Sequence, residues 1–179
     1  MPLFELISHP DHPPHAVTGV TARFEGSSSH DLWVCYEVRD ARTLALPDGA
    51  LSGRADELWR RTCFEMFLKP SAGDAYYEFN FSPSGQWAAY GFDAYRTAMQ
   101  ELPTGSPDLN IGPAGRERYY LHADLKGTAV TADLQIGLSA VIEEQDGTKS
   151  FWALAHPPGP PDFHHPACFA ARLPAPDRP

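Results

Sequence analysis

The sequence predicts an all-β protein, an antiparallel β-sandwich of immunoglobulin-like or jelly-roll-like outline. Short apolar segments recur at regular spacing with turn residues between them, a pattern typical of sandwiches. The 18 prolines and 14 glycines disfavour long helices. No amphipathic stretch is long enough to supply the crossovers of a parallel sheet. At 179 residues, the chain 1–179 is expected to form one domain with a frayed tail at 174–179.

The N-terminal third is expected to contain three strands. Residues 1–16 supply a short strand and then a lead-in rich in Pro and His, and 17–25 alternate weakly. The segment 32–39 is a clear strand with two distinct faces. Leu32, Val34, Tyr36 and Val38 form one face, and Trp33, Cys35, Glu37 and Arg39 form the other. Residues 40–56 read as loop.

A β-hairpin follows, with strands at 62–68 and 76–82 around the turn-rich segment Lys-Pro-Ser-Ala-Gly-Asp. Strand side chains alternate between faces, so each strand has an apolar and a mixed face. The apolar face holds Phe64, Met66, Leu68, Tyr77, Phe79 and Phe81, and the other holds Cys63, Glu65, Phe67, Tyr76, Glu78, Asn80 and Ser82. The hairpin therefore can bury one face and present carboxylates and an amide on the other.

The rest of the chain is expected to add more short strands. One strand spans 87–92, and 93–100 forms a helical turn or an extension of that strand, followed by a loop at 104–115. A second hairpin is predicted around Lys126-Gly127, from strands at 119–125 and 128–136.

Three further elements complete the predicted fold. Residues 137–144 are expected to form a helical turn, and 151–156 a strand. A Pro-rich loop at 157–166 leads to the last strand at 168–173.

Charge and cysteine content limit the possible partners and location. The net charge of −9 argues against nucleic acid, because phosphate binding needs a basic face. The N-terminus lacks a secretory pattern, and no apolar stretch approaches membrane-spanning length. Cys35, Cys63 and Cys168 are widely spaced and odd in number, so we expect reduced thiols in a cytoplasmic protein without a membrane partner. The sequence leaves the oligomeric state open.

The hairpin region carries one group of candidate binding residues. Flat indoles can cover the C–H faces of a sugar-like ligand, while carboxylate, amide and guanidinium groups hydrogen-bond its hydroxyl rim. The candidates are Trp59, Arg60, Arg61, Glu65, Glu78, Asn80 and Trp87. A structural alternative stays open, in which both tryptophans belong to the core and the glutamates pair with arginines.

The loop "HPPGPPDFHHP" carries a second group: His156, Asp162, Phe163, His164 and His165. Prolines stiffen such a loop and hold its polar groups in place. Zn²⁺ stays an alternative, but adjacent histidines in this loop match no ordinary zinc spacing. His156, at the end of its strand, is the leading candidate for the binding face.

No sequence motif of a known catalytic class occurs, whether nucleophile elbow, zinc-protease helix, phosphate loop or dinucleotide loop. Glu65 and Glu78 stay open as an acid–base pair if their carboxyls lie at a suitable spacing.

The segments "LWRRTCFEMFL", "YYEFNFSPSGQWAAY" and "FWALAHPPGPPDFHHPACFAARL" together resemble the DOMON-like proteins of the family 9 carbohydrate-binding-module superfamily. The resemblance spans roughly residues 15–173. It is strongest in the W-x-x-x-x-x-E step from Trp59 to Glu65 and in the "YYEFNFSPSG" strand after it. It implies a β-sandwich whose concave sheet binds a small ligand.

By position, the resemblance implies that Trp59 stacks on a sugar and that Glu65 accepts a hydroxyl. The second stacking aromatic comes from a late loop, where this chain has Phe163 and His164 in place of a tryptophan. We expect no cofactor, and calcium stays open because some members bind it through acidic clusters. Haem, bound by Met and His in other members, is disfavoured because Met66 shares the predicted core face with Phe64 and Leu68.

Three functional hypotheses follow. The favoured one is non-catalytic binding of a small carbohydrate-like ligand on the concave sheet. The second is an enzyme that uses Glu65, Glu78 and His156 as acid–base groups. The third is an oligomerisation module whose aromatic face is covered by a second chain.

Overall fold

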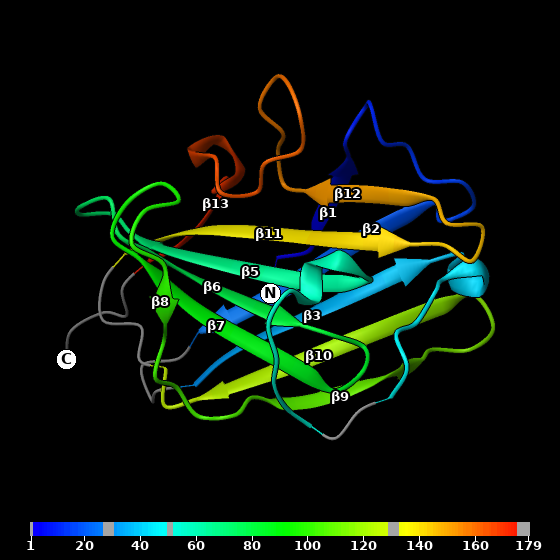
Figure 1. The fold of residues 1–179 in the computed structure, drawn as a ribbon, viewed down its shortest axis with the longest axis horizontal. Coiled ribbons are helices and arrows are strands. Elements are labelled where there is room, and N and C mark those ends of the chain that lie inside the picture. Colours follow the sequence, from blue (N-terminus) through cyan, green and yellow to red (C-terminus); the bar gives the residue numbers. More distant parts are fainter. Residues whose placement is uncertain (1, 27–30, 50–51, 129–132, 175–179) are drawn as a thin grey trace.

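The computed structural model describes residues 2–26, 31–49, 52–128 and 133–174, and in it the chain forms two mostly antiparallel sheets packed against each other (Figure 1). The back sheet has the strand order β1-β2-β3-β10-β9, and the front sheet β4-β7-β6-β5-β11-β12-β1. Strand β1 joins the two, because its first half pairs with β2 and its second half with β12. The predicted all-β fold is confirmed.

The back sheet consists of β1 (Phe4–Ser8), β2 (Gly19–Gly26), β3 (Asp31–Arg39), β9 (Asp108–Pro113) and β10 (Arg118–Lys126). The front sheet consists of β4 (Gly53–Arg54), β5 (Cys63–Pro70), β6 (Tyr76–Phe81), β7 (Gln86–Phe92), β8 (Gln100–Glu101), β11 (Leu134–Glu143), β12 (Lys149–Ala153) and β13 (Ala171–Leu173). Three single-turn 3₁₀ helices lie in the connections: η1 (Ala41–Thr43), η2 (Leu58–Arg60) and η3 (Pro166–Cys168). None of the described helices is long and apolar enough to span a membrane.

The main core fills the space between the sheets, and strand alternation selects its members. The predicted inward faces are confirmed for β3 (Leu32, Val34, Tyr36, Val38), β5 (Phe64, Met66, Leu68) and, in β6, for Phe79 and Phe81, all of which are buried in one cluster. Tyr77, predicted on the same face of β6, is exposed instead. Tyr36 also donates its hydroxyl proton to the backbone oxygen of Glu65 at 2.6 Å, which links the two sheets.

A second apolar cluster lies on the opposite face of the front sheet. It comprises Phe67, Tyr76, Ala88, Tyr90, Phe92, Val141, Ala153, Phe163 and Phe169. Phe163 and Phe169 come from the segment between β12 and β13, so this C-terminal loop packs on the sheet face (Figure 1). The front sheet is therefore covered by the back sheet on one side and partly by this loop on the other.

Four predicted elements differ in the structure. Residues 137–144 were expected as a helical turn, but β11 runs through them as a central strand between β5 and β12. The second predicted hairpin is wrong, because β10 pairs with β3 and β9 in the back sheet while β11 lies in the front sheet; residues 129–132 of that prediction lie outside the described residues. The predicted loop at 104–115 contains the edge strand β9, and the predicted loop at 40–56 contains η1 and the short strand β4.

A buried carboxylate ties the N-terminal segment to the end of β11. Glu144 is 1 % exposed and follows directly after β11. Its Oε1 accepts the backbone N–H of His15 at 2.7 Å, and its Oε2 accepts the N–H of Ala16 at 2.8 Å and the hydroxyl of Thr43 at 2.7 Å. Buried polar groups need such partners, so this carboxylate stabilises the path of the chain into β2.

Candidate ligand-binding site

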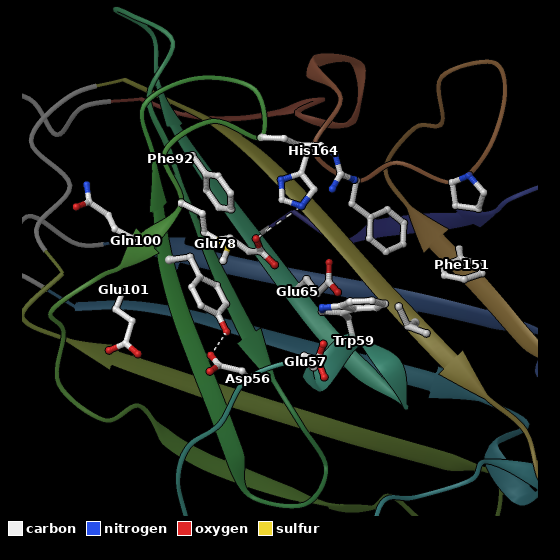
Figure 2. A pocket seen from close by; sticks show the side chains of 16 residues that line it. Asp56, Glu57, Trp59, Glu65, Glu78, Phe92, Gln100, Glu101, Phe151 and His164 are labelled. Carbon is white, nitrogen blue, oxygen red and sulfur yellow. Dashed lines mark hydrogen bonds and ion pairs between the residues drawn. The ribbon is translucent and has the colours of Figure 1, made fainter.

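The free face of the front sheet holds a cavity of about 1220 Å³. Its walls come from β5, β6, β7, β8, β11 and β12, from the segment before β5, from the turn between β7 and β8, and from the C-terminal loop. Figure 2 shows carboxylates, aromatic rings and an imidazole pointing into it. The lining residues are Asp56, Glu57, Trp59, Glu65, Glu78, Tyr90, Phe92, Arg96, Met99, Gln100, Glu101, Val141, Phe151, Pro161, Phe163 and His164.

Glu65 and Glu78 form the polar floor of the cavity. They lie on neighbouring strands β5 and β6, where Glu65 is opposite Asn80 and Glu78 opposite Phe67, so the two carboxylates are diagonal neighbours on one face. Both are almost fully buried. Oε2 of Glu65 accepts from the Ser139 hydroxyl at 3.4 Å, and Oε1 of Glu78 accepts from the Asn80 amide at 2.8 Å.

Burial makes both of these carboxyls hard to ionise. Loss of water raises the pKa of Glu65 well above its ordinary value, and the charge of Glu78 raises it further. Burial also raises the pKa of Glu78, although the hydrogen bond from Asn80 and the positive charge of Arg96 act in the opposite direction. The pair therefore retains a proton at a pH where an exposed glutamate is ionised.

His164 reaches the cavity from the C-terminal loop, with its Nε2 at 3.7 Å from Oε2 of Glu78 (Figure 2). Its Nδ1 lies 2.8 Å from the Tyr76 hydroxyl, which also accepts the backbone N–H of Arg96 at 3.1 Å. The Tyr76 hydroxyl thus has its own proton to donate to Nδ1, which assigns the remaining ring proton to Nε2, facing Glu78. Burial, reinforced by the nearby charge of Arg96, lowers the pKa of His164 to about 4, so the ring is neutral at pH 7.

Asp162 fixes the loop that carries His164. Its Oδ1 accepts from the Arg96 guanidinium at 2.7 Å and from the His164 backbone N–H at 3.2 Å, while its Oδ2 accepts from the Tyr95 hydroxyl at 2.5 Å. Burial alone raises the pKa of Asp162, but the hydrogen bonds from Tyr95 and Arg96 outweigh it and leave the pKa lowered. A carboxylate that is stable as an anion therefore joins the loop to the turn after β7.

Trp59 stands at the mouth of the cavity on η2, with half of its surface exposed. Figure 2 shows its ring beside Glu65 and Glu57. The Arg60 guanidinium lies 5.6 Å from the ring centre and pairs with Glu57 at 2.6 Å. An exposed indole held over buried carboxylates offers a flat apolar surface to a ligand.

The pair Tyr90–Asp56 closes another side of the cavity. The Tyr90 hydroxyl donates to Oδ1 of Asp56 at 2.6 Å. Burial, assisted by this hydrogen bond, raises the pKa of Tyr90, so the phenol is a proton donor at neutral pH. The Arg54 guanidinium lies 5.6 Å from the Tyr90 ring and 5.5 Å from the Trp87 ring.

The buried floor predicts a pH dependence of stability. A carboxyl whose pKa is raised by folding contributes its full stability below ~4.3, the ordinary value, and this contribution is lost as the pH rises through the raised pKa. We therefore expect the free energy of unfolding of Glu65→Gln to exceed that of the wild type at pH ~8. The difference should be larger than the ~0.5 kcal/mol by which surface substitutions usually change stability. The gain should vanish near pH ~4.

Urea unfolding across this pH range checks the prediction, with Glu37→Gln on β3 as a matched control. His164 acts in the opposite sense, since its contribution is lost as the pH falls from ~6.5 toward about 4. This loss affects wild type and variant alike, so the difference between their free energies of unfolding reports the contribution of Glu65 alone. A Glu65→Gln variant less stable than the wild type at pH ~8 would contradict the assignment.

The cavity brings together five of the twelve candidate residues: Trp59, Glu65, Glu78, Phe163 and His164. The other seven do not line it. Among them, Arg61 pairs with Glu143, Asp162 holds Arg96, and His165 caps η3. Trp87 was expected to contact the ligand, but it packs in the main core between the sheets because its parity on β7 turns it away from the cavity. Asn80 is buried behind the lining, where it supports Glu78. Arg60 lies outside the cavity with its guanidinium on Glu57 and Trp59.

His156 was the leading loop candidate, and the structure corrects this. Its Nε2 lies 2.9 Å from the backbone oxygen of Ile7, and its ring packs edge-on against His9 at 4.9 Å. Burial lowers its pKa. It holds the base of the loop to the N-terminal strand and is absent from the cavity lining.

Sequence reasoning missed several lining residues, chief among them Arg96, Asp56 and Tyr90. Tyr90 could have been found from its position on the same face of β7 as Ala88 and Phe92. No local pattern marks Asp56 or Arg96, because they lie in loops whose direction is set by contacts with distant segments.

The metal and haem alternatives can be checked against the donor sets present. Among the described residues, no group of three or more His, Cys, Asp or Glu side chains is arranged to hold a metal ion. Met66 is fully buried in the main core, as predicted, and faces away from the cavity. Cys35, Cys63 and Cys168 are unpaired.

Comparison with known proteins adds information on the fold. No protein-family model and no curated protein matches the chain. A proposed carbohydrate-binding protein from Bacteroides uniformis superposes with a TM-score of 0.66 and 19% identity, over 94% of this chain and 84% of that one. A family 9 carbohydrate-binding module from Caldicellulosiruptor kristjanssonii, in complex with glucose, superposes with a TM-score of 0.53 and 10% identity, over 98% of this chain and 86% of that one. The chain therefore has the fold of the family 9 carbohydrate-binding modules, the fold that its hairpin motifs imply.

Proposed function

We propose that this protein binds a small carbohydrate in the front-sheet cavity without transforming it. One observation carries the proposal: an exposed indole and two buried carboxylates line the same cavity of about 1220 Å³. The shared fold with a glucose-bound module supports the same conclusion. The hollow shape also favours a small ligand over a flat interface with a second chain.

The lining residues suit the two surfaces of a sugar ring. Burying ~100 Å² of C–H surface against Trp59 is worth roughly 2–3 kcal/mol. Glu65 and Glu78 can accept hydrogen bonds from sugar hydroxyls at the floor of the cavity, and each such hydrogen bond adds a net ~1 kcal/mol. After the cost of immobilising the ligand, a binding constant in the micromolar to millimolar range is expected.

Titration calorimetry with D-glucose, D-xylose, cellobiose and cellotriose tests the proposal. We expect saturable heat for at least one of these sugars, lost in Trp59→Ala and kept in Trp33→Ala, whose tryptophan lies on the back sheet and contacts His122. Absence of heat with every sugar would contradict the proposal.

The raised pKa values of Glu65 and Glu78 favour one alternative, an acid–base enzyme acting on the same ligand. His156 takes no part in it, because it does not line the cavity. Analysis of the sugars recovered after titration distinguishes the two functions. Intact cellobiose and cellotriose support binding alone, whereas released glucose would establish catalysis.

A further inference from the structure

The acidic residues of the cavity fall into two groups according to their partners. Glu57 pairs with Arg60 at 2.6 Å, and Glu101 lies 3.5 Å from Arg54. Asp56, Glu65 and Glu78, in contrast, have no lysine or arginine within ion-pair distance in the described part of the chain. The interior of the cavity thus concentrates unpaired carboxyls, while the acids at its edge are balanced.

Neither of the two basic residues that line the cavity supplies a charged group in direct contact with these carboxyls. The Arg96 guanidinium is bound to Asp162 at 2.7 Å, and Asp162 also holds the loop in place. His164 lies 3.7 Å from Glu78 but is neutral at pH 7, since burial lowers its pKa to about 4. Glu65 and Glu78 therefore feel the charge of Arg96 only from a distance, and a cation in direct contact with them would have to come from a ligand.

The floor also has room for further hydrogen bonds. Ser139 contacts one oxygen of Glu65 at 3.4 Å, and in the described residues the other oxygen of this buried side chain has no hydrogen-bond partner. An ammonium group carries three N–H donors and one charge, and so satisfies two adjacent carboxylates better than a hydroxyl does. The open face of Trp59 at the mouth can in addition attract a cation or cover the ring that bears it.

From this arrangement we propose that the cavity selects a saccharide that carries an ammonium group, such as a 2-amino sugar, with the ammonium seated between Glu65 and Glu78. The inference rests on the proposed carbohydrate-binding function and specifies its ligand class. A neutral sugar leaves the pair with its retained proton, as in the free protein, whereas an ammonium sugar stabilises both carboxylates as anions.

Seating an ammonium group should also release a proton. Loss of water raises the pKa of both floor carboxyls in the free protein, and a bound cation lowers them again. Other titratable or charged groups around this pair are Asp56, Tyr90, Arg96, Asp162, Tyr76 and His164 in or beside the cavity, together with the buried Cys63 and Tyr36. Affinity for an ammonium sugar should consequently rise with pH, up to the pH at which the ligand amine loses its own proton.

The test compares D-glucosamine with D-glucose, N-acetyl-D-glucosamine and choline by titration calorimetry near neutral pH. D-glucosamine should bind at least about tenfold more tightly than either neutral sugar. Titration in buffers of different ionisation enthalpy should show proton release with D-glucosamine and none with D-glucose. Choline, a cation without a sugar ring, should bind more weakly than D-glucosamine, and equal or tighter binding of choline would overturn the assignment to a saccharide.

Two isosteric variants locate the effect. Glu65→Gln and Glu78→Gln should each remove most of the preference for D-glucosamine over D-glucose, while Glu37→Gln, which removes the same charge from the back sheet, should keep it. If D-glucose or cellobiose binds and D-glucosamine binds no more tightly, this inference is wrong and the proposed function stands. If no sugar binds, both fail.

Discussion

Trp59→Ala is expected to weaken sugar binding by roughly 30- to 150-fold, corresponding to the ~2–3 kcal/mol that a sugar face gains on the indole. The change should leave the fold intact, because half of the Trp59 surface is exposed and the residue lies outside both apolar clusters. Calorimetry measures the affinity, and urea unfolding of the same variant measures its stability.

Trp59→Phe distinguishes stacking from a general effect on the cavity mouth. A smaller ring retains part of the stacking surface, so this variant should bind with intermediate affinity. Wild-type affinity in Trp59→Ala would show that the ligand does not use the indole, and would contradict the assigned binding mode.

Glu144→Gln is expected to destabilise the fold by about 2–3 kcal/mol. The buried carboxylate accepts three hydrogen bonds, from His15, Ala16 and Thr43. An amide of the same shape must turn its NH₂ group toward one of these donors, which leaves that donor unsatisfied in a buried site. For a chain of this length the melting temperature should fall by roughly 4–12 °C.

Glu117→Gln provides the control, since this glutamate is exposed and lies 3.5 Å from Arg42 at the surface. It should change stability by less than ~0.5 kcal/mol. Equal melting temperatures for Glu144→Gln and Glu117→Gln would show that the N-terminal segment is held by other contacts.

The sequence was sufficient to predict the strands whose two faces differ. In β3 and β5 the inward residues are apolar and the outward ones mixed, so the two-residue period locates both strand and core face. The same parity correctly placed Met66 in the core and Glu65 with Glu78 on the free face. Alternation along β7 also indicated the core for Trp87, but its indole was assigned to the ligand because tryptophan is a common binding residue.

Where both faces of a strand are covered by apolar side chains, the sequence no longer alternates between apolar and polar residues. The stretch Gly137-Leu138-Ser139-Ala140-Val141-Ile142 is buried throughout, since β11 lies at the centre of the front sheet with apolar clusters on both sides. Such a stretch lacks alternation and cannot be distinguished from a helical turn by pattern alone. The Lys126-Gly127 pair was mistaken for a hairpin turn, although the chain changes sheets after β10.

Only part of the candidate site could be predicted, because half of it depends on contacts between distant segments. The alternation of side chains in β5 and β6 predicts the floor. The walls, in contrast, depend on hydrogen bonds between distant segments, from Arg96 to Asp162 and between Tyr76 and His164. These pairs are separated by 66 and 88 residues along the chain. No local pattern encodes such a meeting, so the roles of Arg96 and Asp162 emerge only in the folded protein.

The most direct test of sugar binding in the front-sheet cavity is a crystal structure of the protein soaked with D-glucose. The proposed function predicts electron density for one sugar ring against the Trp59 indole, with hydroxyls within hydrogen-bonding distance of Glu65 and Glu78. Density for the sugar elsewhere, for example in the smaller hollow of about 600 Å³ between the Ser84 turn and β9, with the main cavity empty, would contradict it.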